Sequence, residues 1–212
     1  MTAERTRDLR VAPKLEYATL AWMALEFASA VALGLLSGSL LLLAFGLDSL
    51  IELVSAVVIV WQLRVELRGD FDLEQTAPVE RRAAVWTGYL LYALAAYVVV
   101  SSAYGLALGH RAEVESVWGL LIGIIALTAM PWLAYYKRKL AGPGRLNSTS
   151  LRADASEAVS CAYLAGVLIV GLLLSRLVGW WWLDSVAALG LVPFIALEGR
   201  EATSEAHEGE ED

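Results

Sequence analysis

Six apolar stretches separated by short polar segments make up most of this chain. Stretches of this kind are typical of transmembrane helices, which need about 20 mostly apolar residues. The last stretch is shorter than the others and would cross a bilayer with little tilt. The predicted spans are 15–36, 40–63, 83–108, 117–136, 151–174 and 183–197. The pattern therefore predicts an all-α fold, a bundle of six transmembrane helices.

The composition supports this prediction. Of the 212 residues, 58% are hydrophobic and 18% are charged, against about 45–50% and about 25% in soluble domains. We expect a cytoplasmic N-terminal segment at 1–14, a six-span membrane domain at 15–199, and an acidic, disordered cytoplasmic tail at 200–212 that carries much of the net charge of −7. The sequence has no basic stripe of the kind that binds nucleic acid.

Lysines and arginines concentrate on one side of the predicted bundle. Six spans place both termini on the same side as the second and fourth loops, and that side holds fourteen of the sixteen lysines and arginines. Cytoplasmic loops of membrane proteins carry an excess of these residues. We therefore predict a multi-pass protein of the cell membrane with both termini in the cytoplasm.

Two acids, Asp48 and Glu52, stand near the middle of the second span. Because they are four residues apart, they share one face of a helix. Carboxylates at that depth are costly to bury, and they face protein or water with a proton or a cation to balance them. Two interpretations stay open: half of a cation site, or two neutral acids that are hydrogen-bonded to neighbouring helices.

The fifth span carries a second polar group, Asp154, Glu157 and Cys161, spaced three and four residues apart on one helical face. Counted from the cytoplasmic ends of their spans, Glu52 and Cys161 lie at nearly the same depth, about 15–17 Å. The two spans together could supply three carboxylates and one thiolate: Asp48, Glu52, Glu157 and Cys161. Such a set suits tetrahedral Zn²⁺ or a similar transition metal. A lone buried cysteine is more often an apolar filler, which is the alternative for Cys161.

These motifs resemble those of the cation diffusion facilitator family of divalent-metal/proton antiporters. The likeness covers residues 15–199 and rests on 46–52 in the second span, on 153–157 with Cys161 in the fifth, and on 182–189 at the start of the sixth. It implies a transport domain of six spans, with ligand pairs on the second and fifth, that forms a homodimer. The family's usual cytoplasmic domain and histidine-rich loop have no counterpart in this sequence, so the chain resembles a short, membrane-only branch.

The resemblance implies a secondary active transporter and not an enzyme. We expect export of a divalent transition metal from the cytoplasm, first of all Zn²⁺ and otherwise Fe²⁺, Mn²⁺, Cd²⁺ or Co²⁺, in exchange for protons. The expected partners are the lipid bilayer, protons and a second copy of the chain. A membrane metal sensor or scaffold that does not transport is the alternative, because a fold does not fix a function.

Four further polar residues are candidates for surrounding the metal ligands or for relaying protons: Glu26, Ser49, Asp154 and Ser160. Glu26 stands near the middle of the first predicted span, where an ionisable side chain is a functional candidate. A purely structural role for Glu26 is an equal alternative.

Overall fold

The computed structural model describes residues 3–68, 73–109, 117–142, 146 and 149–208. Within these residues the protein consists of six α-helices, each of which contains most or all of one predicted span. The helices are α1 (Ala3–Ser37), α2 (Leu40–Arg68), α3 (Leu73–Leu108), α4 (Val117–Ala141), α5 (Thr149–Val178) and α6 (Leu183–Glu208). The all-α, six-helix prediction is confirmed.

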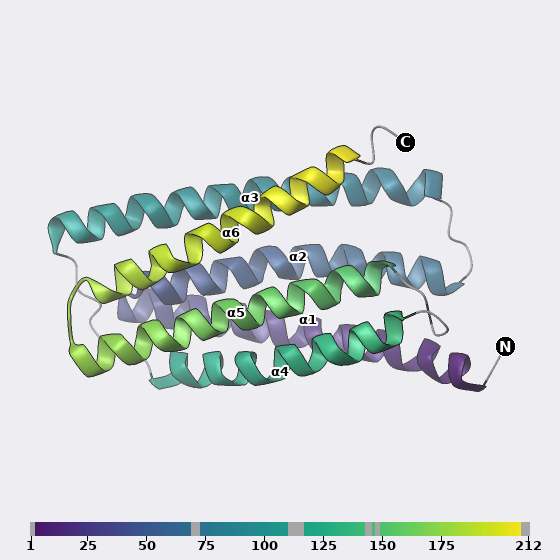
Figure 1. The fold of residues 1–212 in the computed structure, drawn as a ribbon, viewed down its shortest axis with the longest axis horizontal. Coiled ribbons are helices and arrows are strands. Elements are labelled where there is room, and N and C mark those ends of the chain that lie inside the picture. Colours follow the sequence, from purple (N-terminus) through teal and green to yellow (C-terminus); the bar gives the residue numbers. More distant parts are fainter. Residues whose placement is uncertain (1–2, 69–72, 110–116, 143–145, 147–148, 209–212) are drawn as a thin grey trace.

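The helices lie side by side and alternate in direction, so both termini lie at the same end of the molecule (Figure 1). Tight turns join α1 to α2 and α5 to α6 at the opposite end, where Gly38 and Gly179 adopt φ angles of 66° and 67°. Glycine has no Cβ to oppose this left-handed conformation. The alternation follows from the short turns, since a helix that re-enters after a few residues runs antiparallel to its predecessor.

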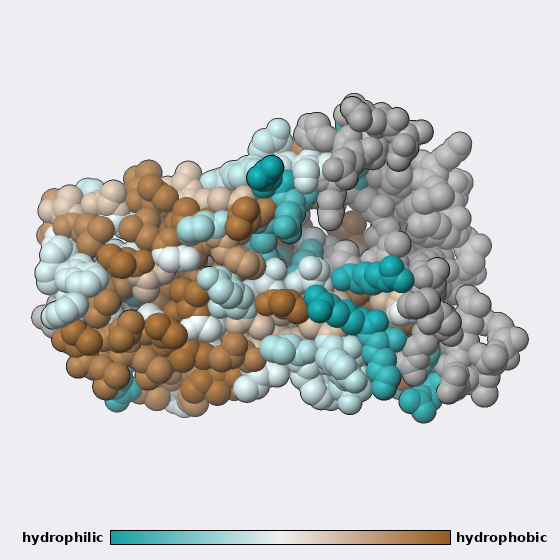
Figure 2. Space-filling view, in the orientation of Figure 1, coloured by the Kyte–Doolittle hydropathy of each residue, from teal (hydrophilic) through white to brown (hydrophobic). Residues whose placement is uncertain are grey.

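Five of the helices, α1 to α5, are long and apolar enough to cross a membrane. The sixth has an apolar first half and a charged second half, which includes Glu198, Arg200 and Glu201. Apolar side chains cover much of the surface at the end where the tight turns lie, and polar residues gather toward the other end (Figure 2). This distribution is that of a multi-pass membrane protein, whose outer face contacts lipid.

All six helices extend beyond the spans that the sequence predicts, and the first and the last reach into the segments expected to lie outside the bundle. Helix α1 begins at Ala3, within the segment expected to precede the bundle, and α6 continues to Glu208, within the expected disordered tail. Both extensions contain good helix formers, and adding a residue to an existing helix is far easier than starting a new one. Residues 209–212 of the expected tail lie outside the described part of the chain.

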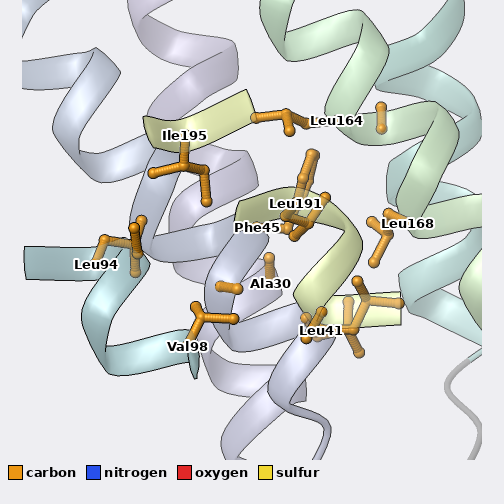
Figure 3. Packing of buried hydrophobic residues seen from close by; sticks show 14 of the residues in the cluster. Ala30, Leu41, Phe45, Leu94, Val98, Leu164, Leu168, Leu191 and Ile195 are labelled. Carbon is orange, nitrogen blue, oxygen red and sulfur yellow. The ribbon is translucent and has the colours of Figure 1, made fainter. Parts of the chain in front are cut away.

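The helices pack as a group of four and a pair. Helices α1, α2, α4 and α5 pack against one another, and α6 packs mainly along α3. The shared core contains Phe45 from α2, Val98 from α3, Leu168 from α5 and Leu191 from α6, together with Ala30 from α1 (Figure 3). This core joins the α3–α6 pair to the other helices and holds α2 in the centre of the molecule.

Candidate metal centre

Three carboxylates meet at the interface between α2 and α6. Asp48 and Glu52 lie on one face of α2, as their spacing predicts, and Glu198 comes from α6. Each of the three can offer an oxygen such that all these atoms lie within 4.8 Å of one another. Asp48 and Glu52 are buried, with 2% and 6% of their surface exposed. We call Asp48, Glu52 and Glu198 the carboxylate centre.

Several oxygens of the carboxylate centre have no hydrogen-bond partner. They are one oxygen of Asp48, both of Glu52 and one of Glu198. A buried carboxylate without a partner is strongly unfavourable, so each must carry a proton or face a cation. Oxygen ligands within this separation suit a divalent ion, which binds carboxylate oxygens at about 2.0–2.6 Å.

A fourth carboxylate, Glu157 of α5, lies beside this centre. One of its oxygens accepts a hydrogen bond of 3.0 Å from the Ser55 hydroxyl of α2, and the other oxygen is buried without a partner. Glu157 interacts electrostatically with Glu52 and with Lys137. Like the carboxylate centre, Glu157 therefore has a buried oxygen without a hydrogen-bond donor.

Glu26 of α1 organises a second set of polar groups. Its carboxylate accepts hydrogen bonds from the Trp22 indole at 2.7 Å, from the Ser49 hydroxyl at 2.7 Å and from the Cys161 thiol at 3.4 Å. Three donors satisfy this carboxylate, unlike those of the carboxylate centre. Glu26 thereby links α1 to α2 and α5, and it interacts electrostatically with Asp48, the neighbour of Ser49 in the chain.

A buried ionic cluster joins α1, α4 and α5. The Lys137 ammonium bonds the carboxylate of Glu16 at 3.1 Å and that of Asp154, and these side chains are 0–2% exposed. Asp154 lies one helical turn before Glu157 on α5. We call Glu16, Lys137 and Asp154 the ionic cluster. The lysine engages the Asp154 side chain, which is not one of the three residues of the carboxylate centre.

The structure brings together some of the residues that the sequence singles out. Asp48 and Glu52 share a face as expected, and the residue that forms a group of three with them is Glu198, which the sequence analysis did not name. Ser160 hydrogen-bonds Glu198, and Ser49 and Cys161 bond Glu26. The assignment of Glu157 and Cys161 as direct ligands stays a prediction.

Sequence reasoning missed Glu198. The predicted sixth span ends at Leu197, so Glu198 falls just outside it and is absent from the predicted site residues. In the structure the helix does not end there, and Glu198 lies one turn after Ile195, which is completely buried. The signal that could have found it is helical spacing: Ala188, Leu191, Ile195 and Glu198 follow one another at three and four residues along one face.

Buried acids inside a bundle of membrane-crossing helices are typical of polytopic membrane proteins that bind or transport ions. The chain belongs to the cation efflux family: the model of the cation efflux transmembrane domain matches residues 17–207. The resemblance to the cation diffusion facilitator family is thereby confirmed.

A curated relative comes from a cyanobacterium. The chain is 28% identical over 162 residues to a protein of Synechocystis sp. described as an uncharacterized transporter. The match covers 74% of this chain and 50% of that protein, so the chain spans about half the length of this relative.

Proposed function

We propose that this protein exports a divalent transition metal from the cytoplasm in exchange for protons, and that the carboxylate centre binds the metal. The observation that carries the proposal is the meeting of Asp48, Glu52 and Glu198 with unsatisfied oxygens in a buried place. Membership of the cation efflux family and the description of the relative as a transporter support it.

The ligands of the centre narrow the choice of metal. Carboxylates and water can bind Zn²⁺ in tetrahedral geometry, and they also suit Mn²⁺ and Fe²⁺. Glu157 could complete the coordination, since one of its oxygens has no hydrogen-bond partner and its side chain interacts electrostatically with Glu52. We propose Zn²⁺ as the first candidate and Mn²⁺, Fe²⁺, Co²⁺ and Cd²⁺ as competitors.

Exchange with protons follows from the chemistry of the ligands. Carboxylates bind a metal in their deprotonated form, so metal entry releases protons and proton entry releases metal. A buried site is stable only when its negative charge is balanced, so it holds either the metal ion or protons. With both termini in the cytoplasm of a cell-membrane protein, the centre would carry metal outward and protons inward. Homodimer formation is part of the proposal on the strength of the family resemblance.

The test is flux into proteoliposomes. Purified protein is reconstituted, a pH gradient is imposed, and Zn²⁺ and Mn²⁺ movement is followed with an enclosed dye. We expect Asp48→Asn and Glu198→Gln to lower the initial rate roughly tenfold or more, because each removes a charged ligand. Glu201→Gln, an exposed neighbour on α6, is the matched control and should transport like the native protein.

Three results would decide between the alternatives. Native flux from both ligand variants would refute the site. Metal flux that is indifferent to the pH gradient would refute proton exchange. Saturable metal binding by calorimetry with no flux under any gradient would instead support the membrane sensor or scaffold.

A further inference from the structure

Helix α6 is fixed to α2 at the end of the molecule that holds the tight turns. Asp184, at the start of α6, accepts hydrogen bonds from the Ser39 hydroxyl at 2.6 Å and from the Leu40 amide at 2.7 Å, with a longer bond from Leu41. These amides open α2 and have no partner within their own helix. Asp184 therefore caps α2 from another helix, and the negative charge also suits the positive end of the helix dipole.

Helix α6 is also locked to α3, close to Glu198. A Cβ placed on Gly88 of α3 would lie 2.5 Å from the Thr203 side chain and 2.8 Å from the Gly199 carbonyl oxygen, so the two backbones touch here. Nearer the turns, the Ser102 hydroxyl of α3 donates to the Ser185 carbonyl at 3.1 Å. Because α3 and α6 are in contact at both of these levels, we expect the two helices to move together.

Between the Asp184 cap and the contact at Gly88, α6 presents a carboxylate to the carboxylates of α2. Glu198 lies fourteen residues after Asp184, roughly 21 Å along the helix. At this level it meets Asp48 and Glu52, and all three are carboxylates. Ionised carboxylates at this separation in a buried place repel one another, and a divalent cation reverses the sign of the interaction.

We propose that the bound cation acts as a clamp that draws the α3–α6 pair onto α2 through Glu198, with the Asp184 cap as the fixed joint. The inference rests on the proposed function, since it takes the carboxylate centre as the cation site. It adds that Glu198 makes the position of the α3–α6 pair depend on the presence of the cation. Loss of the cation separates α6 from α2 at the terminal end and leaves the capped end in place.

Spin-label distances in the full chain test the clamp. Val57→Cys on α2 and Ser204→Cys on α6 are exposed positions beyond the carboxylate centre. A second pair reports on the capped end: Leu36→Cys at the end of α1, next to the start of α2, and Val186→Cys on α6. The native protein, whose one cysteine is buried, serves as the labelling blank. Distances are measured in nanodiscs at one pH, with a chelator and then with saturating Zn²⁺, which is diamagnetic.

We expect Zn²⁺ to shift the 57–204 distance to shorter values and to leave the 36–186 distance unchanged. Glu198→Gln should remove the shift at Zn²⁺ concentrations that calorimetry shows to be saturating for that variant. An unchanged 57–204 distance in Zn²⁺-saturated native protein would overturn the clamp. So would an equal shift in the Glu198→Gln variant.

The clamp and the proposed function fail in different ways. If Zn²⁺ flux depends on Asp48 but the 57–204 distance does not respond, the site stands and the clamp is wrong. If the native protein binds none of the five metals by calorimetry, both are wrong. Asp184→Ala gives an independent check, because loss of the cap should broaden the 36–186 distance distribution, and an unaltered distribution would refute the fixed joint.

Discussion

The buried acids of this protein differ in what balances each side chain. Glu26 has three hydrogen-bond donors, Asp154 has a lysine, and Glu52 has two oxygens without any partner. All are acids within predicted spans or at their ends, and their intrinsic chemistry is nearly the same. The hydrogen bonds of Glu26 and the ion pair of Asp154 therefore stabilise these carboxylates, whereas the oxygens of Glu52 have no such partner.

The role of Cys161 can be tested through metal selectivity. Its thiol donates to Glu26 in this structure, and a serine hydroxyl can make the same bond. We therefore expect Cys161→Ser to change the Zn²⁺ and Mn²⁺ affinities by the same factor, within about twofold. Calorimetry of both metals on both proteins checks this. A loss of Zn²⁺ affinity alone, by about tenfold or more, would show that the thiolate is a ligand, as the sequence predicts.

Lys137 should contribute to stability through the ionic cluster. Lys137→Met leaves the carboxylates of Glu16 and Asp154 buried without their cation, and breaking a buried ion pair in this way costs about 3–5 kcal/mol. Denaturation in detergent micelles should show this loss. Lys139→Met, two residues away and exposed, is the control and should unfold like the native protein.

A compensated variant separates charge balance from packing. The triple substitution Glu16→Gln, Lys137→Met and Asp154→Asn removes every charge of the cluster at nearly constant volume. We expect it to recover most of the lost stability, because no buried charge is left unpaired. A single Lys137→Met variant as stable as the native protein would show that the ionic cluster contributes nothing.

At the level of helices, the position of each element depends on a few close contacts. The α3–α6 crossing needs Gly88, because the Gly199 carbonyl and the Thr203 side chain occupy the place of a side chain. The α2 start needs Asp184, which lies about 145 residues away in sequence. These contacts set the direction of α6 and so place Glu198 against α2.

Alanine substitutions at two glycines should have opposite effects. Gly88→Ala forces a Cβ against a backbone oxygen at 2.8 Å, and such overpacking costs about 1–3 kcal/mol. Gly190→Ala on α6 meets its nearest atom at 3.7 Å, so the better helix propensity of alanine should stabilise the protein by up to about 1 kcal/mol. Denaturation of the two variants measures both. Equal effects would mean that the α3–α6 crossing is not tight.

At the level of the whole molecule, an even number of alternating helices fixes the two termini to one end (Figure 1). The distribution of charge predicts which side of the membrane this end faces. Fourteen of the sixteen lysines and arginines belong to the segments at the end with the termini. Because positively charged loops of membrane proteins are retained in the cytoplasm, we expect the end with the two termini to face it.

Labelling of single exposed cysteines should reveal this orientation. Leu177→Cys lies at the end of α5 next to the turn into α6, and Ser204→Cys lies near the end of α6. In intact cells, a membrane-impermeant maleimide should modify the cysteine at 177 and should reach the one at 204 only after permeabilisation. The native protein is the blank, since Cys161 is buried. The reverse pattern would place the termini outside and reverse the proposed direction of export.

Some residues of the carboxylate centre follow from the sequence and others do not. The shared face of Asp48 and Glu52 follows from a spacing of four, and the structure has it. The partner of this pair does not follow, because equal depth along two spans leaves the rotation of each helix open. Glu157 lies at a suitable depth on α5, yet it bonds Ser55. Glu198 lies beyond the apolar run on α6 and reaches the pair.

The sequence by itself determined the six helices, their alternation and the acid pair on α2, since hydrophobic runs, short turns and helical spacing are local properties of the chain. The tertiary structure alone decided which acids lie close together. The crossing of α6 with α3 and the Asp184 cap place Glu198 beside Asp48 and Glu52, and the ionic cluster engages Asp154 elsewhere. These outcomes depend on how helices rotate and approach one another, and packing between residues far apart in sequence sets both.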